Sequence, residues 1–473
     1  MSVIEVPKKW DHEADVIIVG GGTGGLPAGI VVAETGGKAT VLESRPQCGG
    51  SFAMLGGSIA IAGSDEQKEK GIDDGPETLY DDMVNIAGAD PKLARSFVDN
   101  QLDCYRMIKD TGFKFPGLVP HPGHTRNRCL GWIGGYGPKL VKLIEARARE
   151  RGVEILLKHR AVRLITNPQT GRVIGLKVEV RGEIKNFKAR KAVILATGGF
   201  GHNREMVAEY APHMVDCFPK MPVGHQGDGL KMGLDVGAAT KDIAIAVAPS
   251  WPVCAETHSN ALWVVWHGGI MLNANGERFH NESSEESFYG PMTGSGMRQP
   301  GGVYWVVFVD KMKAKVGTAE GNQEVNQEQI QVVEKCKQYK ADTIEELARN
   351  AGVDAKRLKK TVDKYNRDID NVGYDTVFGR KAPFGFSGTM EKLDTPKFYA
   401  IKCVTSTTSM KGGLKIDADC HVVNNYGELI PGLYAVGEVT GGLFPKTYLL
   451  GIMSSFSFTQ GMIAARNAVK EPA

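Results

Sequence analysis

The chain has 473 residues, and this length predicts two or three domains with sizeable buried cores. Its formal net charge of +3 is too small for the basic face that binding to a phosphate backbone needs, which excludes nucleic acid as a main partner. The scattered cysteines form no C-x-x-C pair, the polar N-terminus lacks an apolar signal core, and no apolar run reaches the length of a membrane span. We therefore expect a cytoplasmic protein without a metal site.

A glycine-rich turn follows the first apolar run of the chain. Residues 15–19 predict a buried strand and residues 26–34 a helix, and the turn between them has G-x-G-x-x-G spacing. Its three glycines are Gly20, Gly22 and Gly25. Such a turn aims backbone N–H groups and the helix dipole at one point, where a diphosphate can bind. Glu43 ends a second apolar run, where a carboxylate can accept hydrogen bonds from a ribose.

Alternating elements continue along the chain. Residues 49–63, rich in Gly, Ala and Ser, predict a loop that is suited to lie against a flat ligand. Two amphipathic helices are expected at 77–111 and 137–151. Strands are expected at 154–158, 161–167, 173–180 and 184–189, as a small β-meander with turns at Gly171 and Gly182. Two further apolar strands, each ending in glycine, are expected at 191–195 and 432–436, and a last helix at 453–468.

The composition changes between residues 240 and 385, where aromatic residues and polar loops give way to charged helices at 343–351 and 356–368. We interpret this segment as an insertion. The sequence thus predicts an α/β fold in which a Rossmann-like nucleotide-binding domain is built from residues 1–239 and 386–473. An α+β capping domain at 240–385 would cover the substrate.

These motifs together resemble a family of two-domain flavoproteins that includes soluble fumarate reductases, 3-ketosteroid dehydrogenases and related FAD-dependent ene-reductases. The resemblance covers nearly the whole chain and starts with the glycine fingerprint and Glu43. It continues through residues 49–51, 196–201, 227–229, 276–282, 365–366, 396–400, 412–414 and 432–438.

The resemblance implies non-covalently bound FAD, extended, with its adenine end near Glu43 and its flavin ring between the two domains. Glu438 would contact ribityl or ribose hydroxyls, and the backbone of Ala161 and Val162 would touch the adenine. The N-terminus of the helix after Ser454 would face the negatively charged edge of the flavin. The full set of implied cofactor-binding residues is Gly20, Gly22, Gly25, Glu43, Gly50, Ser51, Ala161, Val162, Thr197, Gly198, Asp228, Glu438, Ser454 and Ser455.

Three cationic or donor positions of the fumarate reductases differ in this chain. The segment 283–287 contains no arginine, Ser409 stands at a histidine position, and Tyr448 stands at an arginine position. Without those groups, burying two carboxylates would carry a heavy desolvation penalty. Fumarate reduction is therefore disfavoured.

The segment that contains Tyr448, residues 446–451, is more similar to that of the ketosteroid dehydrogenases. There a tyrosine and a backbone N–H bind a ring ketone, and Tyr448 and the N–H near Ile452 match them. A second tyrosine removes the proton α to the ketone, for which Tyr289 is the candidate and Tyr136 the reserve. The resemblance implies oxidation or reduction of a CH–CH bond beside a steroid-like or alicyclic ketone. The donor pair would polarise the carbonyl, a base would move the α proton, and flavin N5 would exchange the hydride.

Two alternatives stay open. One is reduction of an unsaturated carboxylic acid such as fumarate or urocanate, with Lys446 or Lys411 as the carboxylate partner. The other is a flavoprotein subunit that passes electrons to a protein partner. The sequence has no haem motif, no iron–sulfur cysteine cluster and no second nucleotide fingerprint, so we expect an electron donor or acceptor outside the chain. His225 is expected to be a hydrogen-bonded structural residue.

Overall fold

The computed structural model describes residues 6–55, 58–119, 123–131, 136–245, 251–283, 291–316, 330–383 and 389–472. The chain forms two compact units. The first comprises Met1–Val215, Met221–Val247 and Ser409–Ala473, and the second comprises Asp216–Lys220 and Ala248–Thr408. The first unit is therefore built from both ends of the chain, with the second unit inserted between them. This arrangement confirms the predicted fold class.

A mainly parallel sheet forms the centre of the first unit, with the strand order β18-β19-β9-β1-β2-β6. Its strands are β1 (His12–Val19), β2 (Ala39–Glu43), β6 (Glu154–Leu157), β9 (Glu183–Leu195), β18 (His421–Val423) and β19 (Leu429–Ala435). All neighbours are parallel except β18, which adds an antiparallel edge. Strands buried on both faces read as continuous apolar runs, which explains the pattern that predicted β1 and β2.

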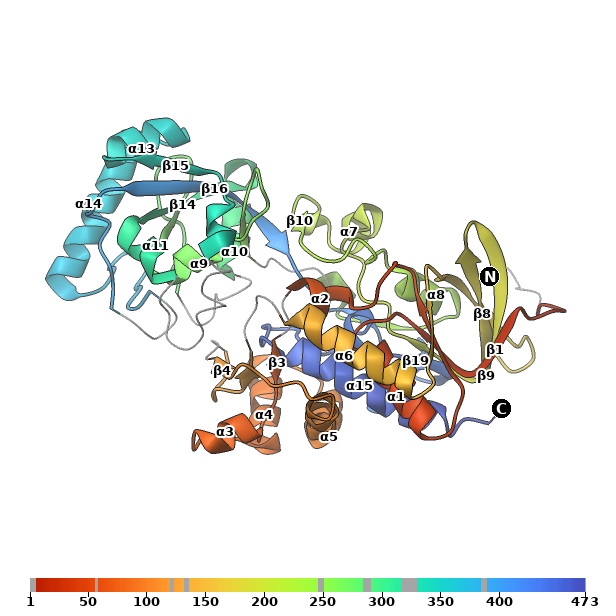
Figure 1. Ribbon diagram of the computed structural model, residues 1–473. Helices are drawn as coiled ribbons and strands as arrows, with labels where there is room; N and C mark the ends of the chain where they lie inside the picture. The colour runs from red at the N-terminus through yellow and green to blue at the C-terminus, as the bar shows by residue number, and fades with distance from the viewer. Residues whose placement is uncertain are drawn as a thin grey trace. The chain divides into compact units, whose positions relative to one another are not determined.

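The C-terminal helix runs through the core of this unit. α15 (Ile452–Ala468) packs against α1 (Gly25–Glu34), which also contacts α6 (Gly137–Glu150), and the three lie side by side in Figure 1. A Cβ added at Gly461 would lie only 2.1 Å from the carbonyl oxygen of Gly24, so the two helices approach at a glycine. Almost every residue of α15 is buried, as expected for a helix that is apolar on all sides.

Local predictions in the first unit differ from the structure in three places. The helix expected at 77–111 is divided into α4 (Pro76–Asp81), a π-helical turn and α5 (Pro91–Lys109), because Gly88 has a φ of 74° and Pro91 starts a new helix. The glycine-rich segment 49–63 is not simply a loop, since it contains α2 (Gly50–Leu55) and β3 (Ile59–Ala60). The strands expected at 184–189 and 191–195 form one strand, β9, whose first half pairs with β8 and whose second half joins the parallel sheet.

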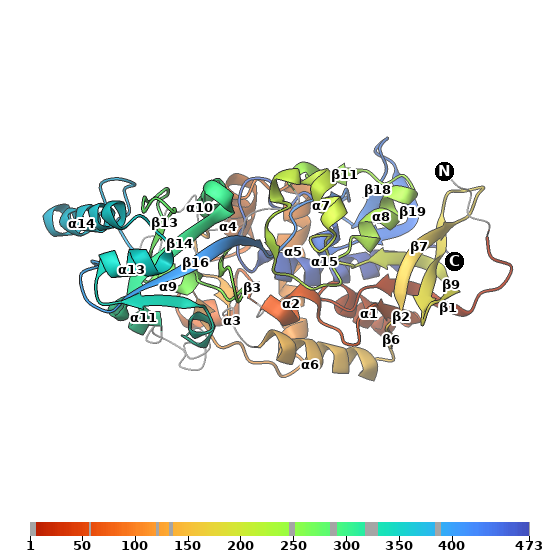
Figure 2. The same ribbon diagram turned by 90° about the horizontal axis from the view of Figure 1, so that it is seen from above.

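The predicted meander is present in part. β7 (Arg160–Thr166), β8 (Val173–Val180) and the start of β9 are antiparallel and form one end of the sheet in Figure 2, whereas β6 pairs with β2. Gly171 and Gly182 turn the chain with φ values of 69° and 84°. The other elements of the first unit are α3 (Asp65–Glu69), β4 (Leu118–Val119), β5 (Cys129–Leu130), α7 (Arg204–Tyr210), α8 (Asp228–Asp235), β11 (Thr240–Lys241) and β17 (Gly413–Leu414).

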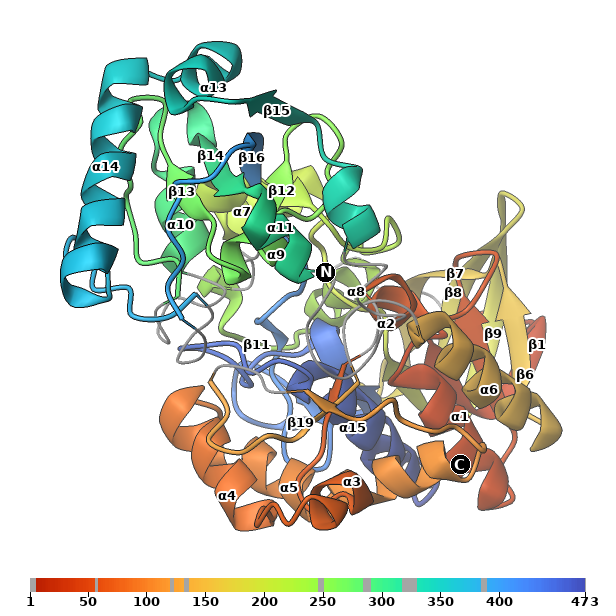
Figure 3. The ribbon, with the colours of Figure 1, turned by 60° about the vertical axis from the view of Figure 1, so that its left-hand side comes forward.

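The second unit is an α+β body around a mostly antiparallel sheet. Its strands are β10 (Phe218–Pro219), β12 (Pro252–Cys254), β13 (Ile270–Leu272), β14 (Val303–Val309), β15 (Gln338–Ala341) and β16 (Phe398–Thr407). The helices α9 (Leu262–Trp266), α10 (Pro291–Met297), α11 (Asp310–Val316), α13 (Ile344–Ala351) and α14 (Ala355–Val372) surround it in Figure 3. Because β16 pairs with β12, β14 and β15, the unit extends beyond residue 385, where the sequence placed its end.

A buried ionic cluster explains the motif at 276–282. Arg278 pairs with Glu282 at 2.6 Å and with Asp375 at 2.8 Å. The fully buried Arg380 donates to the carbonyl oxygens of Gly269 and Val265 and lies 3.5 Å from Glu282. Removing one partner from such a cluster leaves a buried charge uncompensated. The motif therefore holds the second unit together.

The glycine turn offers a direct test of this packing. A Cβ added at Gly25 would lie 1.8 Å from the carbonyl oxygen of Gly20, whereas one added at Gly22 meets no described atom within 4 Å. Gly25→Ala should therefore lower the free energy of unfolding by at least about 2 kcal/mol, because backbone must move. Gly22→Ala, as the control, should change it by less than about 0.5 kcal/mol. Urea unfolding of the cofactor-free protein measures both, and equal losses would contradict this account.

Candidate cofactor and substrate site

Gly22 and Gly50 of the first unit face a common open space at the start of α1. The other two glycines of the turn, Gly20 and Gly25, are required by contacts within the protein, since a Cβ on Gly20 would lie 2.2 Å from the oxygen of Ala196. Gly22 instead has no described atom within 4 Å of an added Cβ, and the nearest atom to a Cβ on Gly50 is the Cα of Gly22, at 3.7 Å. The two residues thus form a cradle at the N-terminus of α1, the place where a helix binds a diphosphate.

Glu43 is buried at the end of β2 and ties down this turn. Its Oε2 accepts the N–H of Gly21 at 2.9 Å and its Oε1 accepts the N–H of Arg45 at 2.8 Å. Burial raises the pKa of this carboxyl above its usual range, although the two N–H groups oppose the change. Each carboxylate oxygen can accept a further hydrogen bond, so Glu43 retains capacity for a ribose hydroxyl.

A β-bulge exposes backbone groups at Val162. Ala161 pairs with Val178 and Arg163 with Lys177, which leaves Val162 as the extra residue of β7. Its backbone amide and carbonyl are therefore not used in the pairing with β8, and their contact with the adenine stays a prediction. The neighbouring Arg160 binds Asp228 through two contacts of 2.7 Å, so the carboxylate of Asp228 supports this wall through the arginine.

Glu438 lies at the centre of a second buried polar group. Its Oε2 accepts the hydroxyl of Ser51 at 2.9 Å, and its Oε1 accepts the N–H of Met410 at 3.3 Å. His225 lies beside both, with Nε2 3.4 Å from the Ser51 hydroxyl and Nδ1 3.8 Å from Glu438. Nδ1 is buried and makes no hydrogen bond with the residues that the structure describes. An orphaned nitrogen beside a buried carboxylate fits a ligand that carries several hydroxyls.

Burial controls the charge of this group. It raises the pKa of Glu438 to about 7, although the bonds from Ser51 and Met410 oppose the change. Burial also lowers the pKa of His225 to about 4, so the imidazole is neutral at physiological pH. The position of His225 requires glycine at 198, which has a φ of 70° and whose added Cβ would lie 2.4 Å from the His225 Nε2. Thr197 packs in turn against Gly229, whose added Cβ would lie 2.1 Å from its hydroxyl oxygen.

The N-terminus of α15 supplies backbone donors. No side chain caps this helix, which Gly451 precedes with a φ of 80°. The Ile452 N–H, which the sequence assigned to a ketone, donates to the carbonyl of Leu449 at 3.3 Å. The next two amides, of Met453 and Ser454, have no partner within the helix, because first-turn N–H groups lack one. The Ser455 hydroxyl donates to the carbonyl of Gly451 at 3.2 Å, so it makes a hydrogen bond within the first turn of the helix.

Tyr448 meets Ser409, a residue distant in the sequence. Burial raises the pKa of the Tyr448 phenol, the nearby Glu438 charge adds to this, and a hydrogen bond with Ser409 opposes it. The ring also packs on Phe444, with centroids 4.7 Å apart. The phenol therefore keeps its proton at neutral pH and can act as a hydrogen-bond donor.

Of the two tyrosines considered as the base, the structure describes only Tyr136. Tyr289 lies outside the residues that the structure describes, so its role stays a prediction. Tyr136 donates its hydroxyl to the carbonyl of Leu130 at 3.2 Å and packs against Phe113. The reserve candidate is thus engaged in the structure of its own loop.

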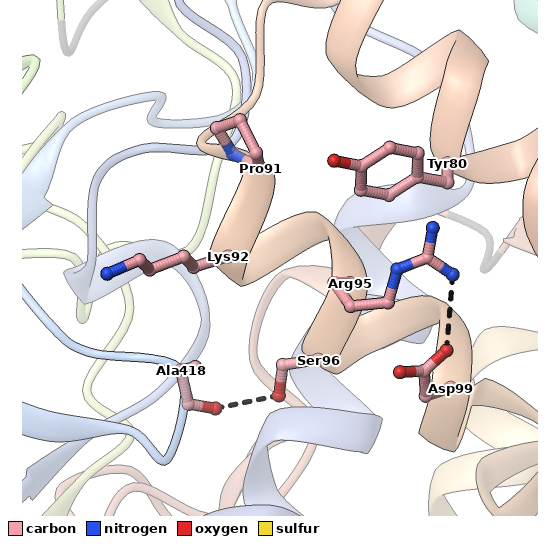
Figure 4. A pocket seen from close by; sticks show the side chains of 7 residues that line it. All are labelled: Tyr80, Pro91, Lys92, Arg95, Ser96, Asp99 and Ala418. Atoms are coloured by element: carbon pink, nitrogen blue, oxygen red, sulfur yellow. Dashed lines mark hydrogen bonds and ion pairs between the residues drawn. The ribbon is translucent and has the colours of Figure 1, made fainter.

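A separate open recess on the first unit is drawn in Figure 4. Arg95 lies over the ring of Tyr80 at 4.1 Å and pairs with Asp99 at 3.4 Å, and Ser96 donates to the carbonyl of Ala418. Arg95 also pairs with Glu77 at 2.8 Å. The side chains of Arg95, Asp99 and Ser96 are thus engaged within the recess, and none of the residues that line the recess belongs to the candidate site.

The sequence did not reveal the partners of two residues of the site. His225 was expected to be a hydrogen-bonded structural residue, and its ring lies 3.4 Å from the Ser51 hydroxyl and 3.8 Å from Glu438. The resemblance implied that the Val162 backbone touches the adenine, but the bulge at Val162 depends on its register with β8, which sequence spacing does not reveal. These partners lie in segments that are far apart in the chain.

Comparisons with known proteins agree with this geometry. The family described as FAD binding domain matches residues 15–453. A probable fumarate reductase of Shewanella frigidimarina is 28% identical over 465 residues, covering 96% of this chain and 74% of the relative. An open flavocytochrome c3 fumarate reductase structure is 27% identical with a TM-score of 0.83, covering 98% of this chain and 79% of that chain. A 3-ketosteroid-Δ4-(5α)-dehydrogenase from Rhodococcus jostii, solved with 4-androstene-3,17-dione, is 25% identical with a TM-score of 0.76 and 98% coverage of both chains.

The cradle at Gly22 predicts a specific defect in cofactor binding. Gly22→Ala places a methyl group where the diphosphate would lie, so the affinity for FAD should fall by more than about tenfold. Titration of the cofactor-free protein with FAD, followed by flavin fluorescence, measures this change. Gly75→Ala is the matched control, since its added Cβ also meets no described atom within 4 Å and lies before α4. Unchanged FAD affinity in Gly22→Ala would contradict the assignment of the cradle.

Glu438 predicts a pH dependence of stability. Its pKa rises from 4.5 to about 7 on folding, so the folded state holds this proton up to a higher pH than the unfolded chain. Stability from this residue is therefore lost as the pH rises from about 4.5 to 7, by an amount on the order of 3 kcal/mol. Glu438→Gln should gain stability relative to the wild type over that range. Urea unfolding of cofactor-free protein at pH 5 to 8 tests this expectation. Glu150→Gln, at an exposed position of α6, is the control. Parallel curves of stability against pH for Glu438→Gln and the wild type would refute it.

Proposed function

This chain belongs to the FAD-binding domain family that matches residues 15–453, and on that basis we propose that it acts on a CH–CH bond beside a ketone. It is an FAD-dependent oxidoreductase of the CH–CH class, as its family and its relatives show. The finer assignment, a ketone or enone of steroid-like or alicyclic type, is our proposal. It rests mainly on Tyr448, a half-buried residue whose phenol keeps its proton at the place where we propose that a carbonyl binds.

The residues of the first unit fit FAD. The cradle of Gly22 and Gly50 would hold the diphosphate, Glu43 the ribose, and the Val162 backbone the adenine. Ser51, His225 and Glu438 would bind hydroxyls of the cofactor. Bound FAD supplies a centre that exchanges a hydride with carbon.

The protein's own contribution is to polarise a carbonyl. The Tyr448 hydroxyl and the amides of Met453 and Ser454, which have no partner within α15, are the donors that we assign to an oxygen that becomes negatively charged in the transition state. Donors of this kind lower the barrier most when they are held in place before the reaction. The contact with Ser409 and the packing on Phe444 hold the phenol in this way. Tyr289 remains our candidate for moving the α proton.

A second candidate function is reduction of an unsaturated carboxylic acid. The similarity to a probable fumarate reductase favours it, as does the TM-score of 0.83 to a flavocytochrome c3 fumarate reductase. Against it, residues 283–287 contain no arginine, and Ser409 and Tyr448 stand where the resemblance places a histidine and an arginine. A dicarboxylate buried there would lack the paired cations that offset desolvation.

Location and electron transfer are also proposals. We place the protein in the cytoplasm, since its eight cysteines are all buried free thiols, as in a reducing compartment. No helix in the described ranges has both the length and the apolar character to cross a bilayer. We also propose an electron donor or acceptor outside the chain, which could be a small molecule or a protein.

Tyr448→Phe tests the proposed function directly. Loss of one donor to a developing oxyanion should lower kcat for enone reduction by about 10²-fold or more. The assay uses reduced dye with cyclohex-2-enone and 4-androstene-3,17-dione, and the bound flavin is measured by absorbance. Tyr136→Phe is the matched control, because its hydroxyl serves the carbonyl of Leu130.

The same assay separates the candidate functions. Full enone turnover in Tyr448→Phe would exclude the carbonyl-donor role. Turnover of fumarate or urocanate, with none of any enone, would establish the second candidate. Stoichiometric flavin that is reduced by a protein partner, with no turnover of a small molecule, would identify an electron-transfer subunit.

A further inference from the structure

We propose that Lys411 binds a carboxylate group on the substrate, so that the substrate is a ketone or enone that also carries an acid. This inference rests on the proposed function and narrows its substrate class. Three observations carry it: the anchored backbone around Lys411, the closeness of Lys411 to Ser409 in the chain, and the absence of a counter-ion for it among the residues that the structure describes.

The backbone on both sides of Lys411 is held in place. Met410 is fully buried and packs on Gly199, where an added Cβ would lie 1.9 Å from the Met410 Cγ. Its N–H donates to Glu438 at 3.3 Å. On the other side, a Cβ on Gly412 would lie 2.1 Å from the carbonyl oxygen of Asp242. The Cα of Lys411 is therefore positioned by contacts that its own side chain does not make.

Lys411 lies close in the chain to a residue that contacts the donor to the carbonyl. It follows Ser409 by two residues, and Ser409 contacts the Tyr448 phenol. Two residues of chain span at most about 7 Å, so the Cα of Lys411 lies within that distance of the Cα of Ser409. A molecule whose carbonyl meets Tyr448 would therefore have its other end within reach of the long, flexible side chain of this lysine.

The lysine is partly withdrawn from water and has no counter-ion among the described residues. It is half-buried, and no carboxylate lies within 4 Å of its Nζ among the residues that the structure describes. Burial alone lowers the pKa of Lys411 to about 8, so most molecules carry the charge at neutral pH. Glu438, the nearby acid, is engaged with Ser51 and Met410. A cation that is withdrawn from water without a partner is costly unless a ligand supplies the opposite charge.

The chemistry of the site favours a carboxylate over a phosphate. A single ammonium is a point charge with three donors and matches a singly charged group. Phosphate sites generally combine several cations or N–H groups. Lys446, the other lysine of this region, is exposed to solvent and has no such desolvation, so it serves as the comparison.

The test compares an acid with its neutral ester on the flavin-loaded enzyme. The probes are 3-oxocyclohexane-1-carboxylate and its methyl ester, and binding is followed by the change in the visible spectrum of the flavin. The wild type should bind the acid at least about tenfold more tightly than the ester. Lys411→Met should bring this ratio close to one, Lys411→Arg should restore most of it, and Lys446→Met should keep the wild-type ratio.

The outcomes separate this inference from the proposed function. A ratio near one in the wild type, or an unchanged ratio in Lys411→Met, would overturn the role of Lys411. Reoxidation of the reduced enzyme by neutral cyclohex-2-enone is measured separately by stopped flow. Acid preference that depends on Lys411, without reoxidation by any enone, would retain the anion site and reject the ketone reaction. Methionine has nearly the volume of lysine, and retained flavin absorbance verifies that each variant is folded.

Discussion

Main-chain contact at the strand-to-helix turn is the constraint around which the first unit is arranged. Gly25 lies against the carbonyl of Gly20, Gly20 against that of Ala196, and Gly461 against that of Gly24. A side chain at any of these glycines would separate the segments. The last helix of the chain can therefore reach the first turn only because neither surface has a Cβ at the crossing. This contact brings the N- and C-terminal parts of the chain together around one cofactor site.

The buried carboxylate of Glu438 links the two halves of the site. It receives one hydrogen bond from Ser51, in the cradle region, and one from the backbone of Met410, in the segment that also carries Ser409 and Lys411. Its charge also raises the pKa of the Tyr448 phenol. Withdrawal from water makes this residue sensitive to its surroundings. A change in the protonation of Glu438 would therefore alter the pKa of Tyr448, a residue proposed to bind substrate.

Similarity to two groups of enzymes leaves the substrate to be decided by a few side chains. The backbone resembles a fumarate reductase and a ketosteroid dehydrogenase with TM-scores of 0.83 and 0.76. The scaffold alone does not select between an acid and a ketone, because function depends on the site that a fold carries. Tyr448 offers a neutral donor and Lys411 a single cation. Together they suit a molecule that has one carbonyl and one negative charge.

The sequence by itself determined the features that depend on local order. Apolar runs, glycine spacing and amphipathic period predicted β1, β2, α1 and α6 and a nucleotide-binding turn, and the change in composition indicated the insertion. The FAD itself was implied by the resemblance to a flavoprotein family. These signals are local because strands and helices repeat every two or 3.6 residues. Only the tertiary structure decided that β9 is one strand, that β16 belongs to the inserted unit, and that His225 lies beside Glu438. Such features arise from pairing and burial between segments far apart in the chain, so the sequence pattern around each residue does not predict them.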